Sequence, residues 1–393
     1  MAMERIGIYG GTFNPPHIGH IQAAKQAVKT LQLDKLLLIP DRVAPHKEIP
    51  DNSPSPWQRL DMLRIAAGQD PALEVSDIEL NREGPSYTYE TVAQLKERYP
   101  QAELVVLMGT DMFLSFPSWH CPQKILAGAA LAVAYRGDRQ ERQEVARMQR
   151  QLESQGAKVY LLENQVTEIS STQLRRMLAF GCADSFLSPG VGNYIRQNGL
   201  YDTGADWHRL PMEQLEQVVR RLLKPNRVAH VLGCRDTAVE LAQRWGADPV
   251  DAARAGLLHD ITKALDGPLQ LTLCQAYGKM LDDFSRKYPK TLHAFTGSLV
   301  AGRIFGENDA VVEAIACHTT GKADMNLLET ILYVADYMEP NRDFPGVERL
   351  RQAAFQDIQA ALKLGLEMTL EHLKNQGSAV SPQSQEALDW LNR

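Results

Sequence analysis

The stretch that most constrains the fold of this 393-residue chain is Arg5–His20, with the sequence RIGIYGGTFNPPHIGH. Its apolar run Ile6–Tyr9 predicts a buried first strand, and helical composition begins at Ile18. The paired glycines Gly10 and Gly11 predict a tight turn between these elements, where a phosphate can approach without meeting a Cβ. We therefore expect a strand, a phosphate-sized loop and a helix start, in that order.

His17 and His20 lie three residues apart, so at the mouth of a helix they share one face and can reach the same phosphate. The string lacks the Gly-Lys-Ser/Thr of a Walker loop and the three spaced glycines of the dinucleotide fingerprint. A lone HxGH is more often a glycine turn with two solvated histidines, but its place after a strand and a double glycine favours function. The string resembles the (H/T)xGH signature of nucleotidyltransferases and, with GGTFNPPH, that of nicotinate-nucleotide adenylyltransferases in particular.

Length and composition narrow the classes of protein to which the chain could belong. A chain of 393 residues exceeds a typical single core, so two domains are expected. The net charge of -6 offers no basic field for extended nucleic-acid binding. The five cysteines include no CxxC pair, which argues against a disulfide framework and fits a reducing cytoplasm. The opening residues do not resemble a signal peptide and no apolar run is long enough to span a membrane, so we expect a cytoplasmic protein with no membrane partner.

Short apolar runs and helical patterns alternate through the first half and predict a Rossmann-like α/β sheet with right-handed crossovers. After the first strand, we expect strands at residues 35–40, 73–76, 103–108, 131–135 and 158–162, and helices at 18–31, 55–67, 87–99 and through the 140s. Ligands bind such sheets at the carboxyl ends of the strands. Trp119, beyond a strand end, either stacks on a flat heterocycle or caps the core, and its spacing alone does not decide.

The resemblance to the adenylyltransferases covers residues 1 to about 201 and implies roles for individual positions. ISSTQLRR at 169–176 is similar to the second signature of that family, although hydroxyls there are more commonly plain helix caps. The implied ATP-binding residues are Gly10, Gly11, Thr12, Phe13, Gly109, Asp111, Ile169, Ser171 and Thr172. The implied nicotinate mononucleotide-binding residues are Lys47, Thr88, Trp119 and Arg136; a loop lysine such as Lys47 is more often merely solvated.

The implied reaction is attack of the mononucleotide phosphate on the α-phosphorus of ATP. His17 and His20 would donate to the α-phosphate, while Arg175 and Mg²⁺ would stabilise the departing pyrophosphate. One departure from the family is Thr110, where alanine is usual.

The pattern changes after the small polar stretch 202–206, which indicates a linker. From Met212 to Leu391 amphipathic helices follow one another without strand-like runs, which predicts an all-α domain. We therefore expect domains at residues 1–203 and 208–393.

Five of the ten histidines fall between Met212 and Leu391. Four of them, together with two aspartates, interrupt apolar helical stretches: His230, His259, Asp260, His293, His318 and Asp336. Any one of these is best explained as a hydrogen-bonded core residue. Six together favour a shared metal, because buried imidazoles and carboxylates need partners. Nitrogen and oxygen ligands without thiolate suit iron or manganese.

This set resembles the HD-domain metal-dependent phosphohydrolases, and LLHDITK at 257–263 with ADYMEPNR at 335–342 looks like the YqeK-type members. The resemblance implies that His230, His259, Asp260 and Asp336 hold one ion, and that His293 and His318 help hold a second with Asp260 bridging. It assigns a catalytic role to Asp260 and Lys263, and neutralisation of a polyphosphate to Lys263 and Arg342. The implied reaction is symmetrical hydrolysis of diadenosine tetraphosphate to ADP. Ala294 stands where relatives usually have glycine.

Several alternatives stay open. The first half could adenylylate another acceptor, such as nicotinamide mononucleotide or phosphopantetheine. The second half could be a nucleotide-sensing regulatory module, or a helical appendage that serves dimerisation. The sequence does not determine the metal, homo-oligomerisation or coupling between the halves.

Overall fold

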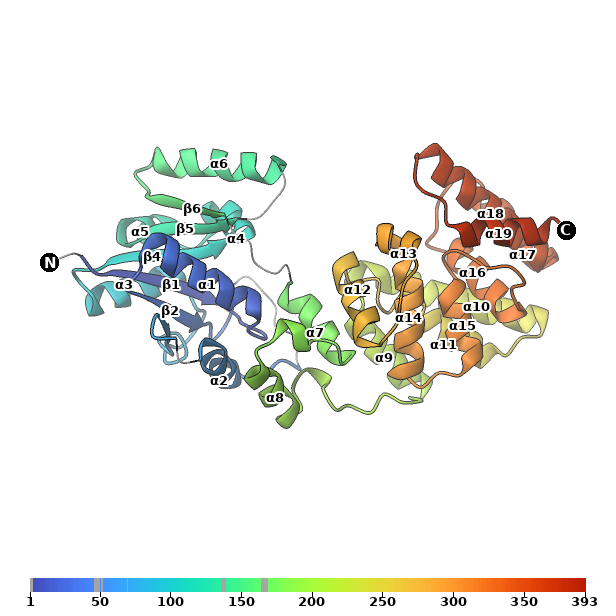
Figure 1. The fold of residues 1–393 in the computed structure, drawn as a ribbon, viewed down its shortest axis with the longest axis horizontal. Coiled ribbons are helices and arrows are strands. Elements are labelled where there is room, and N and C mark those ends of the chain that lie inside the picture. Colours follow the sequence, from blue (N-terminus) through green and yellow to red (C-terminus); the bar gives the residue numbers. More distant parts are fainter. Residues whose placement is uncertain (1–2, 46–49, 51, 69, 136–138, 164–168) are drawn as a thin grey trace. The chain divides into compact units, whose positions relative to one another are not determined.

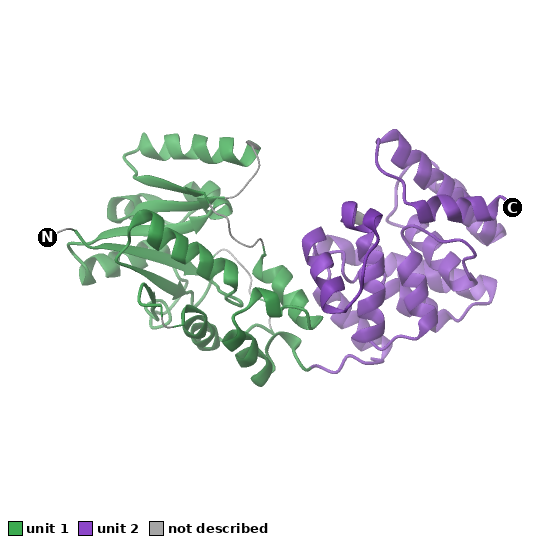
Figure 2. Ribbon diagram, in the orientation of Figure 1, with its two compact units in different colours: residues 1–204 green, residues 205–393 purple. Residues whose placement is uncertain are grey.

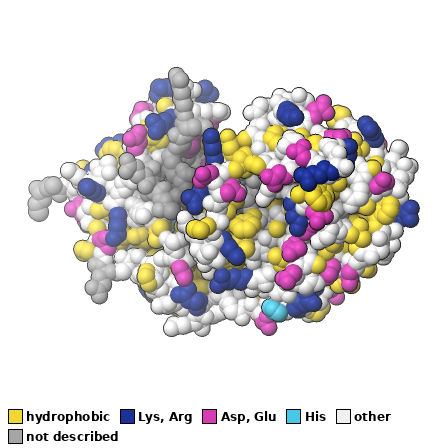
Figure 3. All heavy atoms as spheres, turned by 45° about the vertical axis from the view of Figure 1, so that its right-hand side comes forward, with side chains coloured by type: hydrophobic (Ala, Val, Ile, Leu, Met, Phe, Trp, Pro, Cys, Tyr) yellow, Lys and Arg dark blue, Asp and Glu magenta, His cyan; other side chains and the backbone are white. Residues whose placement is uncertain are grey.

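The computed structural model describes residues 3–45, 50, 52–68, 70–135, 139–163 and 169–393. The chain divides into two compact units, Met1–Gly204 and Ala205–Arg393 (Figure 2). On the face drawn in Figure 3, the described lysine and arginine side chains are interspersed with acidic ones. Within the described part of the chain, no helix combines the length and apolar character that crossing a bilayer requires.

The first unit is built on a six-stranded parallel sheet with the order β3-β2-β1-β4-β5-β6 (Figure 1). Its strands are β1 Arg5–Gly11, β2 Lys35–Pro40, β3 Leu73–Val75, β4 Glu103–Gly109, β5 Ala130–Tyr135 and β6 Val159–Glu163. The predicted α/β fold is confirmed. The strand order reverses between β1 and β4, which is where a sheet of this type leaves a crevice for a ligand.

Helices cover both faces of this sheet. One face packs against α1 Ile18–Leu31 and α2 Pro56–Ala67. The other packs against α3 Thr88–Arg98, α4 Thr110–Ser115, α5 Pro122–Gly128 and α6 Arg139–Glu153. Along β2, Leu36 and Leu38 face the first layer whereas Leu37 and Ile39 face the second, which explains why the run from Leu36 to Ile39 is apolar throughout. The unit is completed by α7 Ser171–Ala179 and α8 Pro189–Gln197.

The paired glycines do not form the turn that the sequence predicts. Gly10 and Gly11 are the last residues of β1 and pair with Ile39 and Pro40 of β2. The chain instead turns at Phe13, whose φ is 46°. A Cβ on Gly10 would have no neighbour within 4 Å, so this glycine keeps the strand end open toward the crevice.

The regular elements among the described residues of the second unit are all helices, as the sequence predicts. Its helices are α9 Met212–Leu222, α10 Val228–Trp245, α11 Pro249–Leu258, α12 Gly267–Ala276, α13 Asp283–Lys287, α14 Leu292–Arg303, α15 Asp309–Cys317, α16 Leu327–Met338, α17 Val347–Gln356, α18 Ile358–Asn375 and α19 Pro382–Leu391. Trp207 stacks on Phe305 with ring centroids 5.6 Å apart, so the start of the unit packs against the segment that follows α14. At Gly256 a Cβ would lie 2.6 Å from the Arg235 Cα, so α10 and α11 approach closely.

Candidate functional sites

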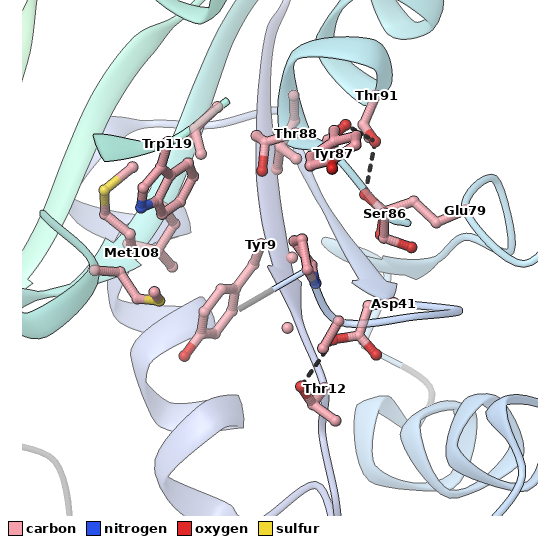
Figure 4. A pocket seen from close by; sticks show the side chains of 18 of the residues that line it. Tyr9, Thr12, Asp41, Glu79, Ser86, Tyr87, Thr88, Thr91, Met108 and Trp119 are labelled. Carbon is pink, nitrogen blue, oxygen red and sulfur yellow. Dashed lines mark hydrogen bonds between the residues drawn. The ribbon is translucent and has the colours of Figure 1, made fainter. Parts of the chain in front are cut away.

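A cavity of about 440 Å³ opens at the carboxyl ends of β1 and β4 in the first unit (Figure 4). Eight of the predicted site residues line it: Gly10, Gly11, Thr12, Phe13, His20, Thr88, Gly109 and Trp119. Trp119 and Met108 lie on one side of the pocket and Tyr87 and Thr88 on another. Trp119 packs against Phe116 at 5.4 Å between ring centroids, so it contacts the core and also presents an aromatic surface to the cavity. Its indole N–H is buried and finds no hydrogen-bond partner among the described residues.

The two histidines of the HxGH string lie together at the start of α1. Their rings stack with centroids 3.6 Å apart, and the backbone N–H of His17 donates to His20 Nδ1 at 3.2 Å. Because Nδ1 accepts this bond, the proton of the neutral His20 ring lies on Nε2. The amino end of the 14-residue helix α1 also favours an anion. The helix start is therefore suited to binding a phosphate.

The second signature approaches the same turn from α7. Ser171 Oγ donates to the Pro15 carbonyl at 3.3 Å, and Arg175 Nη1 donates to the Asn14 carbonyl at 2.8 Å. Arg175 Nη2 also donates to Thr172 Oγ1 at 3.1 Å. Burial lowers the pKa of Arg175, but an arginine remains charged in proteins. The hydroxyls and the guanidinium thus gather beside the turn, outside the residues that line the cavity.

Four other predicted residues have different outcomes. Ile169 is buried just before the start of α7. Asp111 is exposed in the first turn of α4 and is not among the cavity-lining residues. Lys47 and Arg136 lie outside the described residues.

Sequence reasoning missed the residues that hold the HxGH turn in place. Asp41, at the end of β2, accepts hydrogen bonds from Thr12 Oγ1 at 2.8 Å and from Arg59 Nη1 at 3.0 Å. Tyr201 Oη donates to Asn14 Oδ1 at 2.7 Å from the far end of the unit. Of these residues, Arg59 is the one that the sequence could have singled out, because an arginine there interrupts the apolar face of α2. Its side chain is 1% exposed.

The six predicted ligands in the second unit converge on one centre. Their donor atoms form three groups, in each of which all atoms lie within 4.8 Å of one another: His230, His259 and Asp260; His259, His318 and Asp336; and Asp260, His293 and His318. Such sets of imidazole nitrogens and carboxylate oxygens suit a borderline or hard divalent ion, so the residues fit a metal centre. The remaining histidine among the helices of this unit, His372, is exposed on α18 and is not in any of the three groups.

Asp260 lies between two pairs of histidines. Its Oδ2 is 3.7 Å from His230 Nε2 and 3.6 Å from His259 Nε2, whereas its Oδ1 is 3.4 Å from His293 Nε2 and 4.0 Å from His318 Nε2. Burial alone would raise the pKa of Asp260, but the neighbouring histidines and Lys263 outweigh it and hold the pKa well below its ordinary value. A buried carboxylate that stays ionised and directs one oxygen at each histidine pair is suited to bridge two ions.

Three cationic side chains surround this centre. Lys263 Nζ lies 2.9 Å from His293 Nε2, and Arg342 Nη2 donates to Asp336 Oδ1 at 2.7 Å. The third, Arg227, donates to Asp260 Oδ2 and was not predicted from the sequence. It stands three residues before His230, a helical spacing that could have identified it. The cations place positive charge around the cluster of histidine and aspartate side chains.

We expect the metal-free second unit to lose stability as the pH falls from about 6.5 to about 4. Burial first, and then repulsion from His259, lowers the pKa of His318 to about 4, and burial also lowers the pKa of His259. The unfolded chain therefore takes up these protons more readily, and the stability present above pH 6.5 is lost as the pH falls toward the folded pKa. For His318 the loss is about 3 kcal/mol.

Thermal melts of chelator-treated protein across this pH range test the expectation, and His318→Gln should flatten the profile of the second unit. A wild-type profile that does not change over the range contradicts it.

Known families match both units. Residues 8–177 match the cytidylyltransferase-like family, and residues 227–341 match the HD domain. A protein of Aeromonas hydrophila described as "Probable nicotinate-nucleotide adenylyltransferase" is 39% identical over 216 residues, covering 51% of this chain and 99% of the relative. Among solved structures, Plasmodium falciparum nicotinic acid mononucleotide adenylyltransferase complexed with NaAD is 20% identical, covers 51% of this chain and 98% of its own, and has a TM-score of 0.42.

A predicted HD superfamily hydrolase involved in NAD metabolism from Clostridium acetobutylicum is 35% identical, covers 47% of this chain and 97% of its own, and has a TM-score of 0.46. The HD match and the His/Asp cluster imply that the second unit binds a divalent metal. The chain belongs to the nicotinate-nucleotide adenylyltransferase family through its first unit and carries an HD domain in its second.

Proposed function

We propose that the first unit transfers the adenylyl group of ATP to nicotinate mononucleotide, giving nicotinate adenine dinucleotide and pyrophosphate. The observation that carries this proposal is the meeting of the stacked His17–His20 pair with Arg175 beside an aromatic-lined cavity. Nicotinate-nucleotide adenylyltransferase relatives that the chain covers almost completely support the choice of acceptor.

In this reaction a phosphate oxygen of the mononucleotide attacks the α-phosphorus of ATP, and the bond to the bridging oxygen of pyrophosphate breaks. The work of the protein is positioning and charge neutralisation. The His20 Nε2–H would donate to the α-phosphate, and Arg175 would stabilise the pyrophosphate as it leaves. Mg²⁺ bound to ATP would neutralise phosphate charge. Thr88 and Trp119 would position the pyridine ring. Gly109, Asp111 and Ile169 would contact ATP.

The test is a comparison of three acceptors on the full-length chain. Nicotinate mononucleotide, nicotinamide mononucleotide and phosphopantetheine are each incubated with Mg²⁺ and ATP, and pyrophosphate release is measured. We expect nicotinate mononucleotide to have the highest kcat/KM. A preference for either of the other acceptors would contradict the proposed substrate while leaving adenylyl transfer intact.

We also propose that the HD domain hydrolyses diadenosine tetraphosphate symmetrically to ADP. Asp260, placed between two histidine pairs, carries this part of the proposal because it provides for two ions. His230, His259 and Asp336 would complete one site, and His293 with His318 the other, for iron or manganese. Ions held there would polarise a phosphate and activate water. Lys263, Arg342 and Arg227 would neutralise the polyphosphate chain.

Elemental analysis of the full-length protein and a screen of dinucleoside polyphosphates test this second activity. We expect about two ions per chain, with ADP as the product from diadenosine tetraphosphate. Tight nucleotide binding without turnover would favour the sensing module instead. An absence of transition metal, together with a dimer held by the helical unit, would favour the structural appendage.

A further inference from the structure

Glu339 is a buried carboxylate that contacts the metal centre without belonging to the proposed ligand set. It directly follows α16, and its side chain is 1% exposed. Its Oε1 lies 3.0 Å from Nδ1 of His230. The other ring nitrogen, Nε2, faces the cluster at 3.1 Å from Asp336 Oδ1 and 3.2 Å from His259 Nε2. His230 therefore lies between the cluster and Glu339.

The carboxylate of Glu339 is held in place from its other side. Its Oε2 accepts hydrogen bonds from the Asn341 backbone N–H at 2.7 Å and from Asn341 Nδ2 at 2.8 Å. Arg351 Nη2 donates to the carbonyls of Glu339 and Arg342, both at 2.9 Å, and so fixes the backbone of this turn. Among the described residues, the basic group within ion-pair distance of the carboxylate is the His230 imidazole. The arrangement directs the negative charge of Glu339 at one ring nitrogen.

Gly233 is an independent sign that α10 keeps room for this carboxylate. It stands in the helix interior one turn after His230, where glycine is unfavourable. A Cβ at this position would collide with Glu339 Oε2 and would lie 3.1 Å from Asn341 Nδ2. Apart from proline, glycine is the least favourable residue in a helix interior, and α10 has one at the point where Glu339 approaches His230.

Two other histidines of the centre are oriented by backbone carbonyls. His259 Nδ1 and His318 Nδ1 lie 2.7 Å from the carbonyls of Gly256 and Ile315, each within its own helix end. A carbonyl fixes the tautomer of a ligating histidine, whereas a carboxylate also raises its basicity. Of His230, His259 and His318, His230 is the one whose Nδ1 faces a carboxylate instead of a carbonyl.

We propose that Glu339 is a positioning residue that accepts the Nδ1–H of His230, keeps the proton away from Nε2 and strengthens Nε2 as a ligand for a divalent ion. Gly233 is the space that this contact requires. The inference rests on the proposed function, because it needs a centre that binds an ion. Glu339 touches neither substrate nor ion in this role and acts through His230.

The experiment uses the full-length chain, stripped of metal and titrated with Co²⁺, whose visible absorption reports its ligands. Glu339→Gln keeps the shape of the side chain and removes its charge. We expect Co²⁺ binding to weaken roughly 10- to 100-fold, with a changed visible spectrum and an unchanged melting temperature of the metal-free protein. The matched control is Glu367→Gln on α18, whose side chain is exposed and which should bind Co²⁺ like wild type.

Two further variants separate positioning from a general structural role. Gly233→Ala disturbs the same contact from α10 and should also weaken Co²⁺ binding. Adding Glu339→Gln to His230→Ala should cause no further loss, because Glu339 acts through that ring. Unchanged Co²⁺ affinity in Glu339→Gln, or an additive loss on the His230→Ala background, overturns the inference. Failure of the wild-type chain to bind Co²⁺ would instead overturn the proposed metal centre.

Discussion

Asp260→Asn should abolish hydrolysis of diadenosine tetraphosphate, lowering its rate about 1000-fold or more, while adenylyl transfer by the same chain continues. Asp260 is the residue shared by both histidine pairs, with one oxygen facing each. An amide offers one neutral oxygen in place of two charged ones, so one proposed ion loses a ligand and the other keeps only a weaker, neutral one. A metal-assisted reaction then loses several kcal/mol of transition-state stabilisation, and each 1.36 kcal/mol is a factor of about ten.

The measurements are ADP release and metal content of the full-length variant. Asp343→Asn is a matched control, because Asp343 is exposed one residue after Arg342. It should keep both activities. If Asp260→Asn still hydrolyses the substrate at a rate near that of wild type, the proposed centre is not the site of hydrolysis.

His20→Ala should lower kcat for adenylyl transfer about 100- to 1000-fold and change KM for ATP much less. His20 Nδ1 accepts the His17 N–H, so the Nε2–H is the ring donor that would strengthen its bond as charge gathers on the α-phosphate. Removing one donor of this kind typically has an effect of that size. An interaction made mainly in the transition state lowers kcat rather than raising KM.

Steady-state kinetics with nicotinate mononucleotide and ATP check this expectation. Lys29→Ala, at the exposed far end of α1, controls for general effects on the helix and should behave as wild type. The melting temperature of the first unit checks that each variant is folded. A variant whose kcat is unchanged and whose KM for ATP rises would make His20 a ground-state binding residue.

Local patterns predicted the elements well where one physical signal dominated. The helix Ile18–Leu31 and the strand Lys35–Pro40 have the bounds that their apolar patterns predict. The glycine pair was misinterpreted because glycine is compatible with both a turn and a strand end beside a cavity. The actual turn uses Phe13 in a left-handed conformation, which a phenylalanine does not signal.

The candidate sites show the same difference between residues that a local sequence pattern identifies and residues that only a contact with a distant part of the chain explains. The histidines and aspartates of the second unit were recognisable because each is a polar residue in an apolar stretch. The contact between Glu339 and His230 joins positions 109 residues apart, and the meaning of Gly233 depends on it. Neither residue looks unusual in its own segment. Arg59, Asp41 and Tyr201 likewise act across the fold, so only their positions in space show that they hold the turn.

The hydrogen bond from Tyr201 to Asn14 restricts where this protein can be dissected. It attaches the last turn of the first unit to the loop that we propose binds ATP. Trp207, six residues later, packs on Phe305 in the second unit. Any engineered cut must therefore fall within residues 202–206. Truncation before Tyr201 would release the adenylylating loop from its anchor, and a fragment that starts after Trp207 would expose the phenylalanine beneath it.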